Sequence, residues 1–167
     1  MKRTTVDFGI DLGTTNSAIS KMENGNPESI RTQTLKDTMP SCVYINRRKA
    51  IQVGDAAFNA LKNEKLKAMK NWDNSEVNAF IEFKRTMGSD AVYESSNAER
   101  SFSSIELSAE VLKTLKSFEK DENINSVIIT VPAAFKNNQI DATREAGKEA
   151  GFDQVGIITE PEAAAWV

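Results

Sequence analysis

The sequence contains no histidine, and this absence excludes more chemistry than any other feature of its composition. Imidazole is the usual general base and a frequent metal ligand, so Ser-His-Asp and Cys-His catalysis are both excluded. With Cys42 as the single cysteine, the chain also lacks the ligands of a structural zinc site. Catalysis would therefore depend on carboxylates, lysine, hydroxyls, backbone amides and a hard cation such as Mg²⁺.

Other features that are scarce narrow the class of protein further. A lone Cys42 can form no internal disulfide, which favours a reducing cytoplasm. There is no long apolar run, and Asp7 and Asp11 interrupt the stretch that would have to follow Lys2 and Arg3 in a signal peptide, so no membrane association is expected. A net charge of -3 and a pI near 5.2 provide no basic field for nucleic acid.

The first half of the chain is predicted to begin with three strands in a meander, followed by a hairpin and two helices. These elements are the strands 6–11, 17–22 and 28–32, the hairpin strands 42–45 and 50–54, and the helices 56–68 and 79–87. The polar stretch 89–104 is left open between loop and short strands. We interpret the region after residue 39 as a separate, smaller subdomain.

From Ser108 onward the pattern alternates between helix and strand, which predicts an α/β fold. The predicted elements are an amphipathic helix through Val111, Leu112, Leu115 and Phe118, a buried central strand 126–131, a helix 138–150 ended by Gly151, a strand 155–158 and a helix from Pro161. That last helix stops at Val167 before its second turn, so we expect a truncated piece of a longer protein.

The run Asp11-Leu12-Gly13-Thr14-Thr15-Asn16 directly follows the first apolar strand. A carboxylate, a glycine that permits a tight turn, and two hydroxyl residues with their amides are suited to surround a phosphate. No Gly-Lys-Ser or Gly-Lys-Thr follows, so this is not the lysine-containing loop of P-loop NTPases. The same residue types also form ordinary hairpin turns, and the run alone does not decide between these interpretations.

Five motifs together carry a family resemblance. They are the runs at residues 9–17 (GIDLGTTNS), 83–88 (FKRTMG), 107–112 (LSAEVL), 129–133 (ITVPA) and 158–165 (ITEPEAAA). In this order and spacing they resemble the N-terminal ATPase domain of the seventy-kilodalton heat-shock chaperones, the DnaK-like family. The resemblance implies an actin-like, ribonuclease-H-like α/β lobe, with residues 1–39 and 104–167 as the core and 40–103 as a smaller inserted α+β subdomain. The family's second lobe and peptide-binding domain are not part of this chain.

The resemblance also assigns roles to matching positions. Asp11 is similar to the aspartate that holds Mg²⁺ through water, and Lys84 to the lysine that orients the attacking water and balances the charge of the γ-phosphate. Glu160 matches the glutamate that positions water or cation near that phosphate. The first phosphate loop matches Gly13, Thr14, Thr15 and Asn16. From the residues alone, Lys84 could instead be a solvated helix lysine, and Glu160 an acid that favours a helix N-terminus.

Pro132 matches a proline that the family uses as a conformational switch, although it could simply end a strand. The family usually has an aromatic residue where this chain has Ala134 and an arginine where it has Ile140. It also often has other residues at Gly156, Thr159 and Glu162, on the surface that meets the interdomain linker and the J-domain cochaperone. These departures indicate that ATP chemistry survives while allosteric coupling is altered.

The resemblance therefore implies a cytoplasmic molecular chaperone that binds ATP or ADP with Mg²⁺ and uses hydrolysis to control peptide binding. Its partners would be unfolded peptide clients, a J-domain cochaperone and a nucleotide exchange factor. This chain alone is expected to bind nucleotide weakly, and to self-associate through surface left uncovered near Trp166. The alternatives are another actin-like ATPase or a sugar kinase, and a degenerate scaffold that does not hydrolyse ATP.

Overall fold

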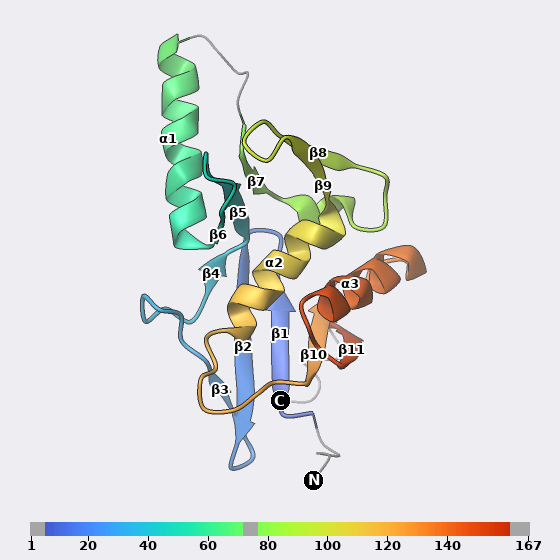
Figure 1. The fold of residues 1–167 in the computed structure, drawn as a ribbon. Helices are drawn as coiled ribbons and strands as arrows, with labels where there is room; N and C mark the ends of the chain where they lie inside the picture. Colours follow the sequence, from blue (N-terminus) through green and yellow to red (C-terminus); the bar gives the residue numbers. More distant parts are fainter. Residues whose placement is uncertain (1–5, 72–76, 161–167) are drawn as a thin grey trace.

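The computed structural model describes residues 6–71 and 77–160, and its largest element is a sheet of six strands (Figure 1). Five strands follow the order β11-β10-β1-β2-β3, and β4 pairs with β2. The strands are β1 (Phe8–Leu12), β2 (Asn16–Glu23), β3 (Asn26–Ser29), β4 (Met39–Pro40), β10 (Ser126–Val131) and β11 (Gln154–Thr159). β1, β10 and β11 run parallel, whereas β2 is antiparallel to β1, β3 and β4. The predicted meander and the buried strand 126–131 are confirmed, while the third strand ends at Ser29 rather than at residue 32.

Two helices, α2 (Ser104–Lys116) and α3 (Asn137–Glu149), cover the same face of this sheet (Figure 1). Alternate residues of the strands point toward them, as the period-2 pattern requires. The buried side chains on this face include Phe8, Ile10, Leu12, Val127 and Ile129 from the strands and Leu107, Val111, Leu112 and Ala146 from the helices. The alternation of helices and strands gives the mixed α/β architecture that the sequence pattern predicts.

The start of α2 is fixed by a capping box. The Ser103 hydroxyl accepts a hydrogen bond from the Glu106 amide at 3.1 Å, and the Glu106 carboxylate accepts one from the Ser103 amide at 2.8 Å. These reciprocal bonds satisfy two amides that a helix N-terminus would otherwise leave without partners. The helix therefore begins at Ser104, four residues before Ser108, where the regular sequence pattern begins.

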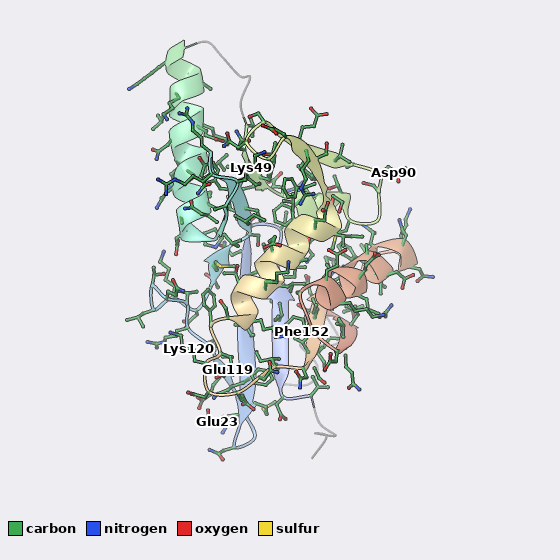
Figure 2. All side chains as sticks on the ribbon, in the orientation of Figure 1. Glu23, Lys49, Asp90, Glu119, Lys120 and Phe152 are labelled. Atoms are coloured by element: carbon green, nitrogen blue, oxygen red, sulfur yellow. The ribbon has the colours of Figure 1, made fainter. Side chains whose placement is uncertain are left out.

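The end of α3 is a Schellman motif, which confirms the predicted role of Gly151. Gly151 adopts φ +87°, its amide donates to the Lys148 carbonyl at 2.9 Å, and the Phe152 amide donates to the Gly147 carbonyl at 3.2 Å. Phe152, labelled in Figure 2, is buried in the core below the helices. The Lys116 ammonium lies 4.8 Å from the centroid of its ring and donates to the Gly151 carbonyl.

A second group of helices and strands lies beyond one end of the large sheet (Figure 1). It contains a three-stranded sheet, a helix packed on it, and a separate two-stranded hairpin. Its elements are β5 (Cys42–Ile45), β6 (Ile51–Val53), α1 (Asp55–Asn71), β7 (Ala79–Ile81), β8 (Val92–Ser95) and β9 (Arg100–Ser103). The predicted hairpin and first helix are confirmed, and the stretch left open at 89–104 contains two short strands.

The predicted helix 79–87 is wrong. Ala79–Ile81 pairs with β5 as strand β7, so its backbone groups are satisfied by the sheet. Glu82 then adopts a left-handed conformation with φ 59°, and only the short 3₁₀ turn η1 (Phe83–Thr86) follows. There is no local sequence signal for this strand, because its pairing partner β5 lies more than thirty residues away.

The predicted helix from Pro161, with Glu162 and Trp166, falls outside the described residues. Among the helices of residues 6–71 and 77–160, none has both the length and the apolar character needed to cross a bilayer.

Substituting Gly147 by alanine should destabilise the chain, although alanine is the better helix former. A Cβ at this position of α3 would lie 2.8 Å and 3.0 Å from the two γ-methyl groups of Val155 in β11. The steric cost of about 1–3 kcal/mol exceeds the gain in helix propensity of about 1 kcal/mol. We expect urea titration to show a lower free energy of unfolding for Gly147→Ala, with a smaller loss in a Val155→Ala background. A Gly147→Ala variant more stable than the original chain would contradict this packing.

The single thiol should be unreactive while the chain is folded. Cys42 is fully buried, and burial, followed by the charge of Glu64, raises the pKa of its thiol to about 12. The reactive thiolate is therefore rare at pH 8. We expect an aromatic disulfide reagent to label the folded chain slowly at pH 8 and to label it at once in guanidinium. Rapid stoichiometric labelling without denaturant would contradict the burial of this side chain.

Candidate functional site

The candidate site lies where three parallel strands end at the same edge of the large sheet. Asp11 of β1 is in register with Thr130 of β10, and Thr130 is in register with Ile158 of β11. Glu160 directly follows the last residue of β11. The Thr130 hydroxyl donates a hydrogen bond to Asp11 Oδ1 at 3.2 Å and so orients this exposed carboxylate. In open α/β sheets, the carboxyl ends of such strands are where ligands bind.

Lys84 reaches this edge from the short turn η1. Its side chain is only 6% exposed, and its Nζ lies 3.9 Å from Glu160 Oε1. Burial lowers the pKa of the Lys84 ammonium, and the charges of Glu160 and Asp11 oppose that shift. The structure therefore brings together Asp11, Lys84 and Glu160 from widely separated parts of the chain. The Lys84 side chain is buried and lies on a short 3₁₀ turn, so the alternative interpretation of a solvated helix lysine is wrong.

Phe135 is a part of the site that the sequence reasoning missed. The Phe135 amide donates to the Pro132 carbonyl at 3.0 Å, which closes a turn directly after β10. This turn places the Phe135 ring centroid 5.5 Å from the Lys84 Nζ, within cation–π distance. Ala134, inside the turn, is exposed, and Ile140 on α3 is half-buried. The signal that could have identified Phe135 is its place three positions after Pro132. The family's aromatic residue was expected two positions after Pro132, at Ala134.

The predicted phosphate loop is the turn of the β1–β2 hairpin, in which Leu12 pairs with Ser17. A Cβ added to Gly13 would lie 1.9 Å from the carbonyl oxygen of Asn16, so this turn requires glycine. The Gly13 amide donates to Ser17 Oγ at 3.2 Å, which removes it from the set that could surround an anion. The amides and side chains that remain for such a role belong to Thr14, Thr15 and Asn16. Thr15 and Asn16 are exposed and Thr14 is half-buried.

Two buried serines hold this turn from below, and the sequence reasoning missed both. Ser17 Oγ lies 2.8 Å from Ser41 Oγ, and the Ser41 hydroxyl donates to the Gly13 carbonyl at 2.8 Å. The single hydrogen of the Ser41 hydroxyl is used on the Gly13 carbonyl, so the Ser17 hydroxyl must donate to Ser41 Oγ. Together with the bond from the Gly13 amide to Ser17 Oγ, these bonds form a ring that begins and ends at Gly13. The Ser41 amide also donates to the Thr15 carbonyl at 2.8 Å. Serines 24 residues apart give no local sequence signal for this ring.

The donor set fits a hard cation held together with a phosphate ligand. Mg²⁺ is usually bound by one or two carboxylates, water and substrate phosphates, and Asp11 offers an exposed carboxylate whose orientation is fixed by Thr130. Within residues 6–71 and 77–160, no cluster of three or more acidic or cysteine side chains could hold a metal by itself. Asp11 would therefore share such a cation with water and phosphate oxygens, and the cation would supply charge neutralisation.

Comparisons with known proteins show the family of this chain. The profile of the family described as "Hsp70 protein" matches residues 7–167. The chaperone protein DnaK of Mesomycoplasma hyopneumoniae strain J is 39% identical over 161 residues, which are 95% of this chain and 24% of the relative. The DnaK proteins of Metamycoplasma hominis and Mycoplasmopsis agalactiae are 36% and 37% identical, over 95% and 96% of this chain and 24% and 25% of the relatives.

The chain thus spans about a quarter of the length of these curated relatives. The family profile covers all but the first six residues, and each of these relatives is more than 30% identical. The chain therefore belongs to the Hsp70 family, and its mixed α/β structure is part of the actin-like fold of that family's ATPase domain.

Proposed function

We propose that this chain forms the first lobe of the ATP-hydrolysing domain of a DnaK-like chaperone. In this proposal residues 1–39 and 104–167 form the core, and 40–103 form the smaller inserted subdomain. The arrangement of the sheets supports the division, because the three-stranded sheet and the β8–β9 hairpin lie entirely within 40–103. The second lobe and the peptide-binding domain would lie in the part of the relatives' length that this chain does not match.

The observation that carries the proposal is the burial of Lys84 beside two carboxylates at the end of the parallel strands. Phosphoryl transfer needs positioning and charge stabilisation rather than covalent help from the protein. Asp11 would hold Mg²⁺ through water, while Lys84 would balance the γ-phosphate charge and orient the attacking water. Glu160 would position that water or the cation. Thr14, Thr15 and Asn16 would contact the phosphate oxygens of ATP or ADP.

In the longer protein, the nucleotide state would control the binding of unfolded peptide clients. A J-domain cochaperone and a nucleotide exchange factor would be its partners, and the cytoplasm its compartment. The relatives' printed name, chaperone protein DnaK, supports this wider function. A sugar kinase is not favoured, because the relatives named here are all chaperones.

The scaffold alternative is opposed by a specific feature of the site. A buried ammonium is costly unless it is paired, and a chain without phosphate chemistry could relieve that cost with an apolar residue. Here the Lys84 side chain is buried, with Glu160 and Asp11 supplying opposite charge.

Pro132 would act as the switch residue. The aromatic group near it would be Phe135, because position 134 carries alanine.

Removal of either charged member of the pair should slow hydrolysis in the longer protein. We expect Lys84→Ala to lower kcat about 100-fold or more, as loss of a group that stabilises developing charge typically does. Glu160→Ala should also lower kcat, with a small change in ATP affinity. Lys113→Ala is the matched control, because this lysine is exposed and pairs with Glu110 on α2. Unchanged steady-state ATPase rates in both site variants would refute the catalytic assignment.

The 167-residue chain by itself should bind nucleotide weakly, since Asp11, Thr15 and Asn16 are exposed. Isothermal titration with ATP and Mg²⁺ should give a dissociation constant well above the micromolar range. Binding in the micromolar range or tighter would contradict the assignment of this chain as only one part of the site.

Light scattering of the same sample should show self-association, and a clean monomer would count against that expectation.

A further inference from the structure

A single hydroxyl on the Lys84 turn makes three hydrogen bonds. Thr86 Oγ1 donates to the Phe83 carbonyl at 3.0 Å and lies 2.7 Å from Tyr93 Oη and 2.6 Å from Ser104 Oγ. A hydroxyl has one hydrogen and two lone pairs. Because the hydrogen is used on Phe83, the hydroxyls of Tyr93 and Ser104 must both donate to Thr86. The Thr86 hydroxyl is therefore fully satisfied, and it is the acceptor for two donors.

The partners of Thr86 come from two different elements. Tyr93 belongs to β8, and Ser104 is the buried first residue of α2. The Tyr93 ring also meets the buried Phe83 ring edge-on, with 6.5 Å between the centroids. The start of α2 is in turn fixed by its capping box. Thr86 therefore connects the turn to strand β8 and to a helix whose start is fixed independently of it.

The turn η1 needs such external support. It has only four residues, and 3₁₀ hydrogen bonds have poorer geometry than those of an α-helix. Glu82 before it adopts a left-handed φ of 59°, and Gly88 after it a φ of 73°. A left-handed non-glycine residue persists only where its surroundings enforce it. The same turn must also hold the Lys84 ammonium in a side chain that is 6% exposed.

We propose that Thr86 is a positioning residue: the triad of Thr86, Tyr93 and Ser104 holds η1 so that the Lys84 ammonium faces Glu160. The purpose of that placement rests on the proposed function, whereas the placement itself is a property of this chain. Valine at position 86 would have nearly the same shape but would accept no hydrogen bond from Tyr93 or Ser104. A buried donor left without an acceptor is unfavourable, so the turn would move to let these hydroxyls find other partners.

Competitive acetylation of lysines on the 167-residue chain tests the placement without any nucleotide. With a trace of acetic anhydride and mass spectrometry, Lys84 should react more slowly than exposed Lys113. Thr86→Val should raise the Lys84 rate at least threefold relative to Lys113. Thr86→Ser keeps the hydroxyl and should leave the rate within a factor of two of the original chain.

The matched control is Thr143→Val on α3. Thr143 is fully buried, and its hydroxyl donates within its own helix to the Gln139 carbonyl at 2.8 Å rather than to η1. This variant should leave the Lys84 rate unchanged. An equal rise in Thr143→Val would mean general loosening and would overturn the proposal, as would an unchanged rate in folded Thr86→Val.

If Thr86→Val does not fold, Tyr93→Phe and Ser104→Ala decide the question, since each removes one donor and keeps Thr86. Both variants should raise the acetylation rate of Lys84. An unchanged rate in both would overturn the proposal, and so would an unchanged rate in one of them. The outcome is separate from the test of catalysis. Unchanged ATPase in Lys84→Ala would remove the function and leave the placement, whereas unchanged acetylation would remove the placement alone.

Discussion

The Lys84 side chain is only 6% exposed. Burial of its ammonium is unfavourable unless neighbouring groups compensate for the charge, and the other groups of the site do so. A buried charge is tolerated when opposite charge and polarisable groups surround it. Here Glu160 lies 3.9 Å away, Asp11 contributes a second negative charge, and the Phe135 ring faces the ammonium. The ion pair is longer than a hydrogen bond, so the ammonium and the carboxylate both retain capacity for a further ligand.

These three groups meet only because of the order of the strands. Asp11, Phe135 and Glu160 lie at or just after the ends of β1, β10 and β11, which are parallel neighbours. Parallel neighbours need long connections: the chain from β2 to α2 connects β1 to β10, and α3 connects β10 to β11 (Figure 1). Parallel pairing holds β11 beside β10, and Gly147 lets α3 pack closely on Val155 of β11. The pairing of these strands thus places Glu160, which directly follows β11, at the same edge as Asp11.

Local patterns were sufficient for much of the fold and for part of the site. The buried strand 126–131 was predicted with its observed limits, because a short β-branched run between a polar turn and Pro132 has one simple interpretation. The segment 79–87 was not, since its strand is stabilised by pairing with the distant β5. The same distinction applies to the site. The apolar strand and the turn residues after it singled out Asp11, and the family resemblance singled out Glu160. Ser41 and Thr130 were missed because they act on residues 28 and 119 positions away.

The family usually has an aromatic residue where this chain has Ala134, and the turn after β10 shows which residue carries the aromatic ring here. Ala134 is exposed inside that turn, and the aromatic ring of the segment is carried by Phe135, which faces Lys84. The carbonyl of Pro132 accepts the Phe135 amide, so a change in the backbone at Pro132 would move this ring relative to the ammonium. The contacts from Pro132 to Phe135 and from Phe135 to Lys84 thus form a continuous path from the end of β10 to the buried ammonium.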